Sequence, residues 1–365
     1  MAAPRFHHLT IADIRQETPD AVSLAFAVPP RLAGAYRFAA GQYLTLRAEI
    51  DGEDLRRSYS ICSGLDDYLR TGELRVAVKR VAGGAFSNFI HDRIKPGDRI
   101  AVMTPAGQFT IPLAPEAVRT LVAVACGSGI TPVMSLLKTV LAREPHARFV
   151  LLYGNRTGRD IIFAEELAGL KDRYLDRLSI FHVLSREMQD VPILQGRLDG
   201  ARIATLLRAA TPLAAIDHAF LCGPAAMMDE AAATFAALGL PAERIHREYF
   251  TPGDGGRIAP APEPLPVEPS AEPAAIAEII IDGRRHEVPL PAGVSVIDAA
   301  RAQGIDLPFS CKGGMCCSCR AKLVAGRAEM AVNYSLQPWE IAAGFILTCQ
   351  ARPLTPRLVL DFDAI

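Results

Sequence analysis

Residues 1–112 alternate between apolar and polar positions over short runs. The stretch "QYLTLRAEIDGEDLRRSYSI" has the pattern of two strands around Asp51-Gly52, and "ELRVAVKRV" that of a third, followed by the turn "KPGD" and by "RIAVMTP". Because successive residues of a strand point to opposite faces, this alternation indicates half-buried strands. Many short strands separated by glycine and proline turns predict an antiparallel β-barrel.

The pattern changes between residues 113 and 250. Apolar runs such as "TLVAVAC", "RFVLLYG" and "DHAFLCGP" alternate there with amphipathic segments such as "PVMSLLKTVLARE" and "AAMMDEAAATFAAL". Strands that alternate with helices are typical of βαβ units. This part of the chain is therefore predicted to be an α/β domain with a doubly wound parallel sheet.

Residues 251–275 interrupt both patterns with prolines every few positions and little apolar content. Such a composition predicts a linker that lets the following domain move. Residues 276–365 have the pattern of a compact α+β domain. "AEIIIDGRRHEVPL" is predicted as a hairpin, "SVIDAARAQG" as a helix with a serine N-cap, and "LQPWEIAAG" as a second helix.

Composition narrows the class of protein. The 365 residues carry a formal net charge of -1 and half of them are hydrophobic, which predicts a globular chain of two or three domains without a nucleic-acid partner. No apolar run approaches the roughly 20 residues that a membrane span needs, and the N-terminus lacks the apolar core of a secretory signal. A cytoplasmic location is expected. Eight cysteines in a chain this long, crowded near one end, do not indicate a disulfide framework.

The cysteines near the C-terminus carry the most specific signal. The stretch "CKGGMCCSC" holds Cys311, Cys316 and Cys319, separated by four and two residues, and Cys349 follows after 29 more. This ladder is the plant-type spacing for a [2Fe–2S] cluster, whereas a structural zinc site usually shows paired C-x2-C knuckles. The prediction is a [2Fe–2S] cluster held by these four thiolates in a β-grasp-like domain. Cys317 departs from the pattern and is expected to be a spectator.

Two motifs in the barrel suit a flavin dinucleotide. "RSYSI" places Arg57 and Tyr59 on one face of a strand, so a cation for a pyrophosphate lies beside an aromatic ring for a flavin. In "GGAFSNFI", backbone N–H groups from Gly84 onward and the Ser87 hydroxyl are predicted to hold the same phosphates at a helix start. Each motif alone is weak, but their order before a nucleotide-type sheet predicts FAD.

The α/β segment carries two turns suited to a second dinucleotide. In "VAVACGSGITP", Gly127 and Gly129 permit close approach of a pyrophosphate, and Thr131 opens the helix, although this is not the GxGxxG fingerprint. The second turn follows another strand, where a nicotinamide can lie, and contains three candidate residues: Cys222, Gly223 and Pro224. A small buried core residue is the alternative for Cys222.

Two arginines bear on the choice of nicotinamide cofactor. Arg156 in "YGNRT" follows the second strand of the sheet, where an acidic residue would favour the NAD ribose, and Arg186 follows one strand later in "LSRE". Both are candidate partners of a 2′-phosphate, which predicts that NADPH is preferred. Solvated arginines are the alternative.

The order of these motifs resembles the ferredoxin–NADP reductase superfamily, and with the C-terminal ferredoxin it resembles the reductases of multicomponent oxygenases. Longer stretches, among them "FHHLTIADIRQETPDAVSLAFAVP", "CGPAAMMD" and "AAGFILTCQARPLT", are similar to one branch of these reductases over essentially the whole chain. The resemblance implies electron transfer from NADPH through FAD and the cluster to a separate di-iron oxygenase. It also implies that four residues act in hydride transfer, with Ser60 near the flavin N5 atom, Cys222 beside the nicotinamide, and Glu248 and Phe250 against the flavin ring.

Alternatives stay open at this level. The reductases of ring-hydroxylating and steroid-hydroxylating oxygenases share the three cofactor motifs, so the motifs alone do not choose the oxygenase. A redox-sensing or metal-storage protein without turnover would not need both a flavin and a nicotinamide motif. Lys312, Arg320 and Lys322 bracket the cluster loop and predict an acidic docking patch on the partner, with a solvated mixed surface as the alternative.

Overall fold

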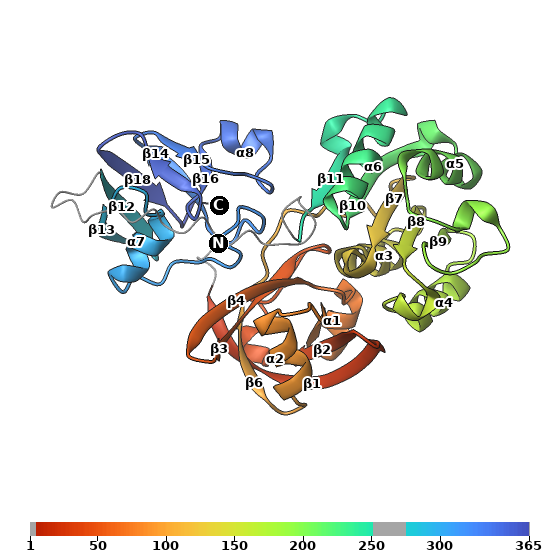
Figure 1. Ribbon diagram of the computed structural model, residues 1–365, viewed down its shortest axis with the longest axis horizontal. Coiled ribbons are helices and arrows are strands. Elements are labelled where there is room, and N and C mark those ends of the chain that lie inside the picture. The colour runs from red at the N-terminus through yellow and green to blue at the C-terminus, as the bar shows by residue number, and fades with distance from the viewer. Residues whose placement is uncertain (1–4, 251–274, 365) are drawn as a thin grey trace. The chain divides into compact units, whose positions relative to one another are not determined.

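The computed structural model of the chain describes residues 5–250 and 275–364 (Figure 1). They form two compact units, one built mainly from residues up to 250 and one mainly from residues after 274. The predicted linker falls outside the described residues except for Ala275, which already belongs to a strand. In the described part of the chain, no helix is long and apolar enough to cross a membrane.

The N-terminal sheet has six strands in the order β4-β3-β6-β1-β2-β5. The strands of the hairpin are where the alternation predicts them, with Asp51 and Gly52 at φ 51° and 83° in the turn. An antiparallel bridge between Ile61 and Val76 joins the end of β4 to β5, and this contact brings the two edges of the sheet together. The elements are β1 (Phe6–Thr18), β2 (Ala21–Ala27), β3 (Tyr43–Ile50), β4 (Glu53–Ser60), α1 (Leu65–Thr71), β5 (Glu73–Lys79), α2 (Ala85–Arg93) and β6 (Arg99–Met103).

The second sheet is parallel, with the order β11-β10-β7-β8-β9. Helices α3 and α4 contribute to the core on one face, and α5 and α6 to the core on the other (Figure 1). The doubly wound sheet is thus confirmed, and α5 is an element that the sequence pattern did not single out. The elements are β7 (Thr120–Cys126), α3 (Ile130–Arg143), β8 (Arg148–Asn155), α4 (Ala164–Arg173), β9 (Leu178–Leu184), α5 (Gly200–Ala210), β10 (Ile216–Cys222), α6 (Ala225–Ala237) and β11 (Ile245–Glu248).

The barrel and the α/β domain pack through α1 and α3. The Ser135 hydroxyl donates to the Ser63 carbonyl at 2.8 Å, and the Leu65 N–H donates to Thr139 Oγ1 at 3.0 Å. Lys138 of α3 lies 3.0 Å from a carboxylate oxygen of Asp67 in α1. Barrel residues also join the apolar core beneath α3. Because the two domains share this core, side chains from both can form one site.

The C-terminal unit is an α+β domain whose main sheet has the order β13-β12-β18-β14-β16. The predicted hairpin is β12 with β13, and the Ser295 hydroxyl accepts from the Asp298 N–H at the start of α7, as expected for an N-cap. The second predicted helix is one short turn. The elements are β12 (Ala275–Ile281), β13 (Arg284–Leu290), α7 (Val296–Ala302), β14 (Arg320–Ala325), β15 (Ala328–Met330), α8 (Pro338–Ala342), β16 (Phe345–Leu347), β17 (Ala351–Pro353) and β18 (Arg357–Asp361).

Candidate functional site

The strand order of the parallel sheet places a ligand site. From β7 the chain moves to β8 and β9 on one side, whereas from β10 it moves to β11 on the other. In such sheets, ligands bind in the crevice beyond the carboxyl ends of the two strands where the order reverses. The loops that leave β7 and β10 are "GSGITP" and "CGP". The two sequence motifs therefore meet at one place.

The first loop combines open space with tight packing. Gly127 has φ +54°, and a Cβ there would meet no atom closer than Lys79 Nζ at 4.0 Å. At Gly129, by contrast, a Cβ would lie 2.1 Å from the Cys222 carbonyl oxygen. Thr131 is buried, and its hydroxyl donates to the Ser128 carbonyl at 3.0 Å, so this side chain shapes the loop. The space at Gly127, beside a lysine and ahead of helix α3, fits a pyrophosphate.

Three of the four residues expected to act in hydride transfer come together. Cys222 pairs with Glu248 in the register of β10 and β11, and Ser60 of β4 donates to the Glu248 carboxylate at 2.9 Å. Desolvation raises the pKa of Glu248 to about 8 and raises that of the buried Cys222 thiol well above its usual value. Both groups are thus neutral at pH 7. Phe250 ends the described part of this unit with 39% of its surface exposed.

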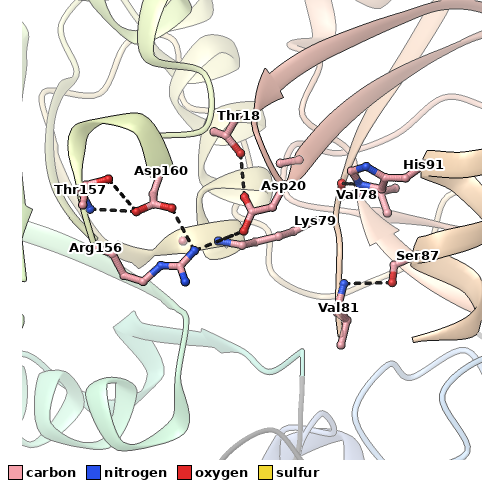
Figure 2. Close-up of polar contacts among 12 residues, drawn as sticks. Thr18, Asp20, Val78, Lys79, Val81, Ser87, His91, Arg156, Thr157 and Asp160 are labelled. Atoms are coloured by element: carbon pink, nitrogen blue, oxygen red, sulfur yellow. Dashed lines mark hydrogen bonds and ion pairs between the residues drawn. The ribbon is translucent and has the colours of Figure 1, made fainter. Parts of the chain in front are cut away.

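In the second sequence motif of the barrel, "GGAFSNFI", the Ser87 hydroxyl is hydrogen-bonded within the motif's own turn instead of being directed toward a ligand. Ser87 is buried, and its hydroxyl accepts from the Val81 N–H at 3.1 Å (Figure 2). The same hydroxyl donates to the Gly84 carbonyl at 3.3 Å. It therefore closes the turn that leads into α2. Gly84 is the N-cap of that helix, and a Cβ there would lie 2.8 Å from Ser87 Oγ. Binding of FAD phosphates by this turn stays a prediction.

Arg57 and Tyr59 lie two residues apart on β4, as the alternation requires. Arg57 donates to the carbonyl of its neighbour Arg56 at 2.8 Å. The Tyr59 ring packs 6.1 Å from the Phe86 ring, between centroids. Their contact with FAD also stays a prediction, but the strand that carries them leads directly to Ser60.

Arg156 and Arg186 follow neighbouring strands of the parallel sheet, and the Arg186 N–H donates to the Arg156 carbonyl at 2.8 Å. The Arg156 guanidinium lies 2.9 Å from an Asp160 oxygen and 3.3 Å from an Asp20 oxygen (Figure 2). Arg186 is exposed. The backbones of Arg156 and Arg186, the two candidate ligands of a 2′-phosphate, are thus adjacent. The Arg156 side chain already forms ion pairs with two carboxylates, those of Asp160 and Asp20. Pro224 is exposed at the N-cap of α6, and Gly223 precedes it.

Two residues at this edge were not singled out from sequence. Lys79 ends β5 beside Gly127. Asn155 ends β8 and is buried, and its amide oxygen and nitrogen make no hydrogen bond of normal geometry among the described residues. Tyr153, two residues earlier on the same face, donates to the Gly127 carbonyl at 3.0 Å. A buried amide of this kind requires an explanation, and a polar ligand at this loop supplies one.

The four predicted cluster ligands come together in the C-terminal unit. Their thiols interact as two pairs, Cys311 with Cys316 and Cys319 with Cys349. The N–H groups of Gly313 and Met315 point at Cys311 Sγ from 3.3 and 3.4 Å. The described residues hold no group of three His, Cys, Asp or Glu side chains placed for a single metal ion. Two thiol pairs instead suit two irons, each of which takes two thiolates.

Cys317 has different surroundings from its neighbours. Its backbone adopts φ +54°, which is uncommon for a residue other than glycine. Burial raises the pKa of its thiol to about 12, and its side chain is hydrogen-bonded with Ser335. The thiol thus interacts with another segment of the domain, and its spectator role stays a prediction.

Comparison with known proteins accounts for all three parts of the chain. Residues 8–111 match the oxidoreductase FAD-binding domain, residues 123–233 the oxidoreductase NAD-binding domain, and residues 279–354 the 2Fe-2S iron-sulfur cluster binding domain. The chain is 45% identical to a subunit of the 1,2-phenylacetyl-CoA epoxidase of Escherichia coli (strain K12), over 98% of both chains.

Two further comparisons extend this picture. The chain is 37% identical to the ferredoxin reductase component of the 3-ketosteroid-9-alpha-monooxygenase of Rhodococcus rhodochrous, over 97% of this chain and 96% of that protein. Its fold is similar to the solved structure of a phthalate dioxygenase reductase, with a TM-score of 0.59, 24% identity and 98% of both chains covered.

The fold and the matched domains define an oxidoreductase that uses FAD, NAD(P)H and a [2Fe–2S] cluster. The chain belongs to the family of oxygenase reductases that includes this subunit of the Escherichia coli 1,2-phenylacetyl-CoA epoxidase. The longer stretches quoted in the sequence analysis indicated the branch of oxygenase reductases to which this Escherichia coli subunit belongs. The 45% identity confirms that resemblance.

The partly buried Glu248 gives a prediction about stability and pH. Its pKa is about 8 in the folded chain, against an ordinary value of 4.5, so between these pH values the folded state holds a proton that the unfolded state has released. The contribution of Glu248 to stability therefore falls as pH rises from about 5 to 8. Glu248→Gln removes this dependence on pH. The free energy of unfolding of the variant, relative to that of the wild type, should therefore increase with rising pH, by up to about 1.4 kcal/mol per unit of pKa shift.

The measurement is the melting temperature of both holoproteins between pH 5 and 9. Glu243→Gln, at an exposed position just before β11, is the matched control and should follow the wild type. Parallel curves for Glu248→Gln and the wild type would contradict the raised pKa.

The environment of Cys317 gives a second prediction. Cys317→Ser should keep about two irons per chain and the visible spectrum of the cluster, because a hydroxyl can replace the thiol in the contact with Ser335. Serine at Cys311, Cys316, Cys319 or Cys349 should lower the iron content. Iron analysis of the five variants decides this, and equal iron loss in Cys317→Ser would show that the fifth thiol also binds the cluster.

Proposed function

We propose that this chain is the reductase subunit of a phenylacetyl-CoA epoxidase, and that it passes electrons from NADPH to a di-iron oxygenase in phenylacetate degradation. The observation that carries the proposal is 45% identity to the Escherichia coli protein over 98% of each chain. A reductase of this kind works beside its oxygenase, and a cytoplasmic location is part of the proposal. The domain division proposed is 1–112, 113–250 and 276–365, joined by the proline-rich linker.

A steroid-oxygenase reductase is the second candidate, because the ketosteroid reductase component is 37% identical over nearly the whole chain. Reconstitution separates the two. The purified chain is combined with the oxygenase of either system, and product is measured at equal rates of NADPH-dependent cytochrome c reduction. Epoxide formed from phenylacetyl-CoA is the expected result. Coupled turnover with the ketosteroid oxygenase alone would overturn the proposal.

Two sites carry the proposed reaction: a dinucleotide site for hydride transfer and a cluster site for electron delivery. Flavin accepts two electrons as a hydride and releases them singly to a one-electron cluster. In the first site, Gly127 and Lys79 bind the dinucleotide phosphates, and the Cys222–Gly223 turn orients the nicotinamide end. Ser60 and Glu248 form a neutral hydrogen-bonded pair beside it. Because the Glu248 carboxyl holds its proton at pH 7, it presents no negative charge to an incoming hydride.

In the second site, the chain holds the cluster and exposes apolar side chains on the segment that is hydrogen-bonded to the cluster loop. The Tyr334 N–H and the Ser335 hydroxyl donate to the Gly314 carbonyl of the cluster loop, at 3.0 and 3.1 Å. This segment continues into α8. Between residues 332 and 341 it exposes four large apolar side chains, with exposed fractions of 38 to 61%: Val332, Tyr334, Trp339 and Ile341. We name these four the delivery face.

Several charges near the loop are engaged within the domain. Lys312 lies 2.5 Å from a carboxylate oxygen of Asp298. Arg320 is paired with the buried Glu340, and Lys322 lies 5.9 Å from the centre of the Phe345 ring. An acidic patch on the oxygenase stays a prediction. The apolar delivery face is the better-supported contact, since exposed aromatic side chains beside a reaction centre are typical anchors of interfaces.

The dinucleotide site generates a prediction about cofactor choice. Arg156→Ala and Arg186→Ala should each lower the NADPH to NADH ratio of kcat/KM, by about tenfold where a charged hydrogen bond to phosphate is lost. Steady-state cytochrome c reduction with both cofactors measures the ratio. Arg208→Ala, which removes an exposed arginine of α5 in the same domain, should leave it unchanged. An unaltered ratio in both variants would show that these arginines do not contact the 2′-phosphate.

The delivery face generates a prediction about the partner. Trp339→Ala should slow electron delivery to the oxygenase by about tenfold, because truncation of a central aromatic anchor typically costs more than about 1 kcal/mol. Cytochrome c reduction and iron content should stay as in the wild type. Val324→Ala removes a side chain of comparable exposure, 57%, from β14 of the same domain and serves as the control. Equal coupled rates for both variants would exclude Trp339 from the interface.

A further inference from the structure

Asp20 lies in the turn between β1 and β2, and its carboxylate is held in place on one side. The Thr18 hydroxyl donates to Asp20 Oδ1 at 2.9 Å, and Thr18 is itself buried. The backbone carbonyl of Asp20 accepts from the Arg80 N–H at 2.7 Å. These contacts fix the second carboxylate oxygen, Oδ2, in one direction (Figure 2).

Two cations from different domains converge on that oxygen. Lys79 Nζ of the barrel lies 3.4 Å away, and a guanidinium nitrogen of Arg156, from the α/β domain, lies 3.3 Å away (Figure 2). Arg156 has a second anchor in Asp160, whose carboxylate is held by the N–H and hydroxyl of Thr157 at 3.0 and 2.9 Å. Removal of the Asp20 charge would therefore leave Arg156 oriented.

The same two cations border the dinucleotide loop. Lys79 is the nearest group to the open side of Gly127, and Arg156 directly follows Asn155, whose buried amide makes no hydrogen bond of normal geometry among the described residues. A bound dinucleotide brings a pyrophosphate to this loop, and NADPH brings a third phosphate. Phosphate oxygens and the Asp20 carboxylate thus compete for the same N–H donors.

We propose that Asp20 is an affinity-determining residue of the dinucleotide site. Its carboxylate occupies Lys79 and Arg156 in the free protein and repels an incoming phosphate, so binding has to transfer these cations from Asp20 to the dinucleotide. The inference rests on the proposed role of Arg156 in binding a 2′-phosphate. The carboxylate accordingly weakens the dinucleotide complex, which favours release of the oxidised cofactor after each hydride transfer.

Asp20→Asn tests this, because the amide keeps the shape and the Thr18 contact but removes the charge. A unit charge about 5 Å from a phosphate in water is equivalent to about a fourfold change in affinity. The dissociation constant of 2′,5′-ADP from the holoprotein should therefore fall about fourfold or more, and that of 5′-ADP should fall as well, since Lys79 is freed for the pyrophosphate. Both are measured by calorimetry at low salt.

Two variants serve as controls. Asp54→Asn removes a carboxylate of similar exposure that pairs with Arg47 at 2.7 Å on the β3–β4 hairpin, and it should not tighten binding. Asp20→Glu restores the charge and should restore weaker binding. Should Asp20→Asn hold less FAD than the wild type, Asp20→Ser is measured in its place.

The outcomes separate this inference from the function on which it rests. Unchanged or weaker binding in the neutral Asp20 variant overturns the inference, because the carboxylate would then be irrelevant or would position the cations for the ligand. If Arg156→Ala also leaves 2′,5′-ADP binding unchanged, the assigned role of Arg156 fails with it. If Arg156→Ala weakens that binding while neutral Asp20 has no effect, only the inference fails.

Discussion

The close approach of two backbones, at Gly129 and Cys222, is the constraint on which the first site depends. Any side chain at Gly129 would overlap the Cys222 carbonyl, at 2.1 Å from a Cβ, so the loops after β7 and β10 can meet only through a glycine. That contact fixes the open loop at Gly127 relative to the end of β10. Through the register of β10 and β11 it also fixes Glu248, and the hydrogen bond to Ser60 connects the sheet to the barrel.

Much of this arrangement could be predicted from sequence where local pattern determines structure. Strands β3 to β6 were predictable because apolar and polar residues alternate along these short runs, and the cluster ligands because their spacing matches a known coordination loop. Ser87 shows the limit: its residue type suited a phosphate, but the structure directs its hydroxyl to Val81 and Gly84. The contact of Asp20 with Arg156 joins residues 136 positions apart, so only the tertiary fold reveals it.

The dinucleotide site and the cluster site stabilise negative charge in different ways. Around the dinucleotide loop, cations are held by carboxylates and become available to phosphate, while the carboxyl group nearest to Cys222 is kept neutral by burial. Around the cysteines, backbone N–H groups point at Cys311 sulfur and offset the negative charge of thiolates. At both sites, positively polarised groups of the chain are already positioned for the negative charge of the phosphates or of the thiolate-bound cluster.

The position of Trp339 has a consequence for spectroscopy. The chain contains a single tryptophan, and it lies on an exposed turn of the C-terminal unit with 61% of its surface accessible. Its emission therefore reports from one place only, close to the cysteine loop. Because the cluster and the oxidised flavin both absorb in the range where tryptophan emits, the part of the quenching that disappears when FAD alone is removed reports the distance between the two units in solution. Trp339 is therefore an intrinsic fluorescence reporter of the separation of the two units, and no attached label is needed.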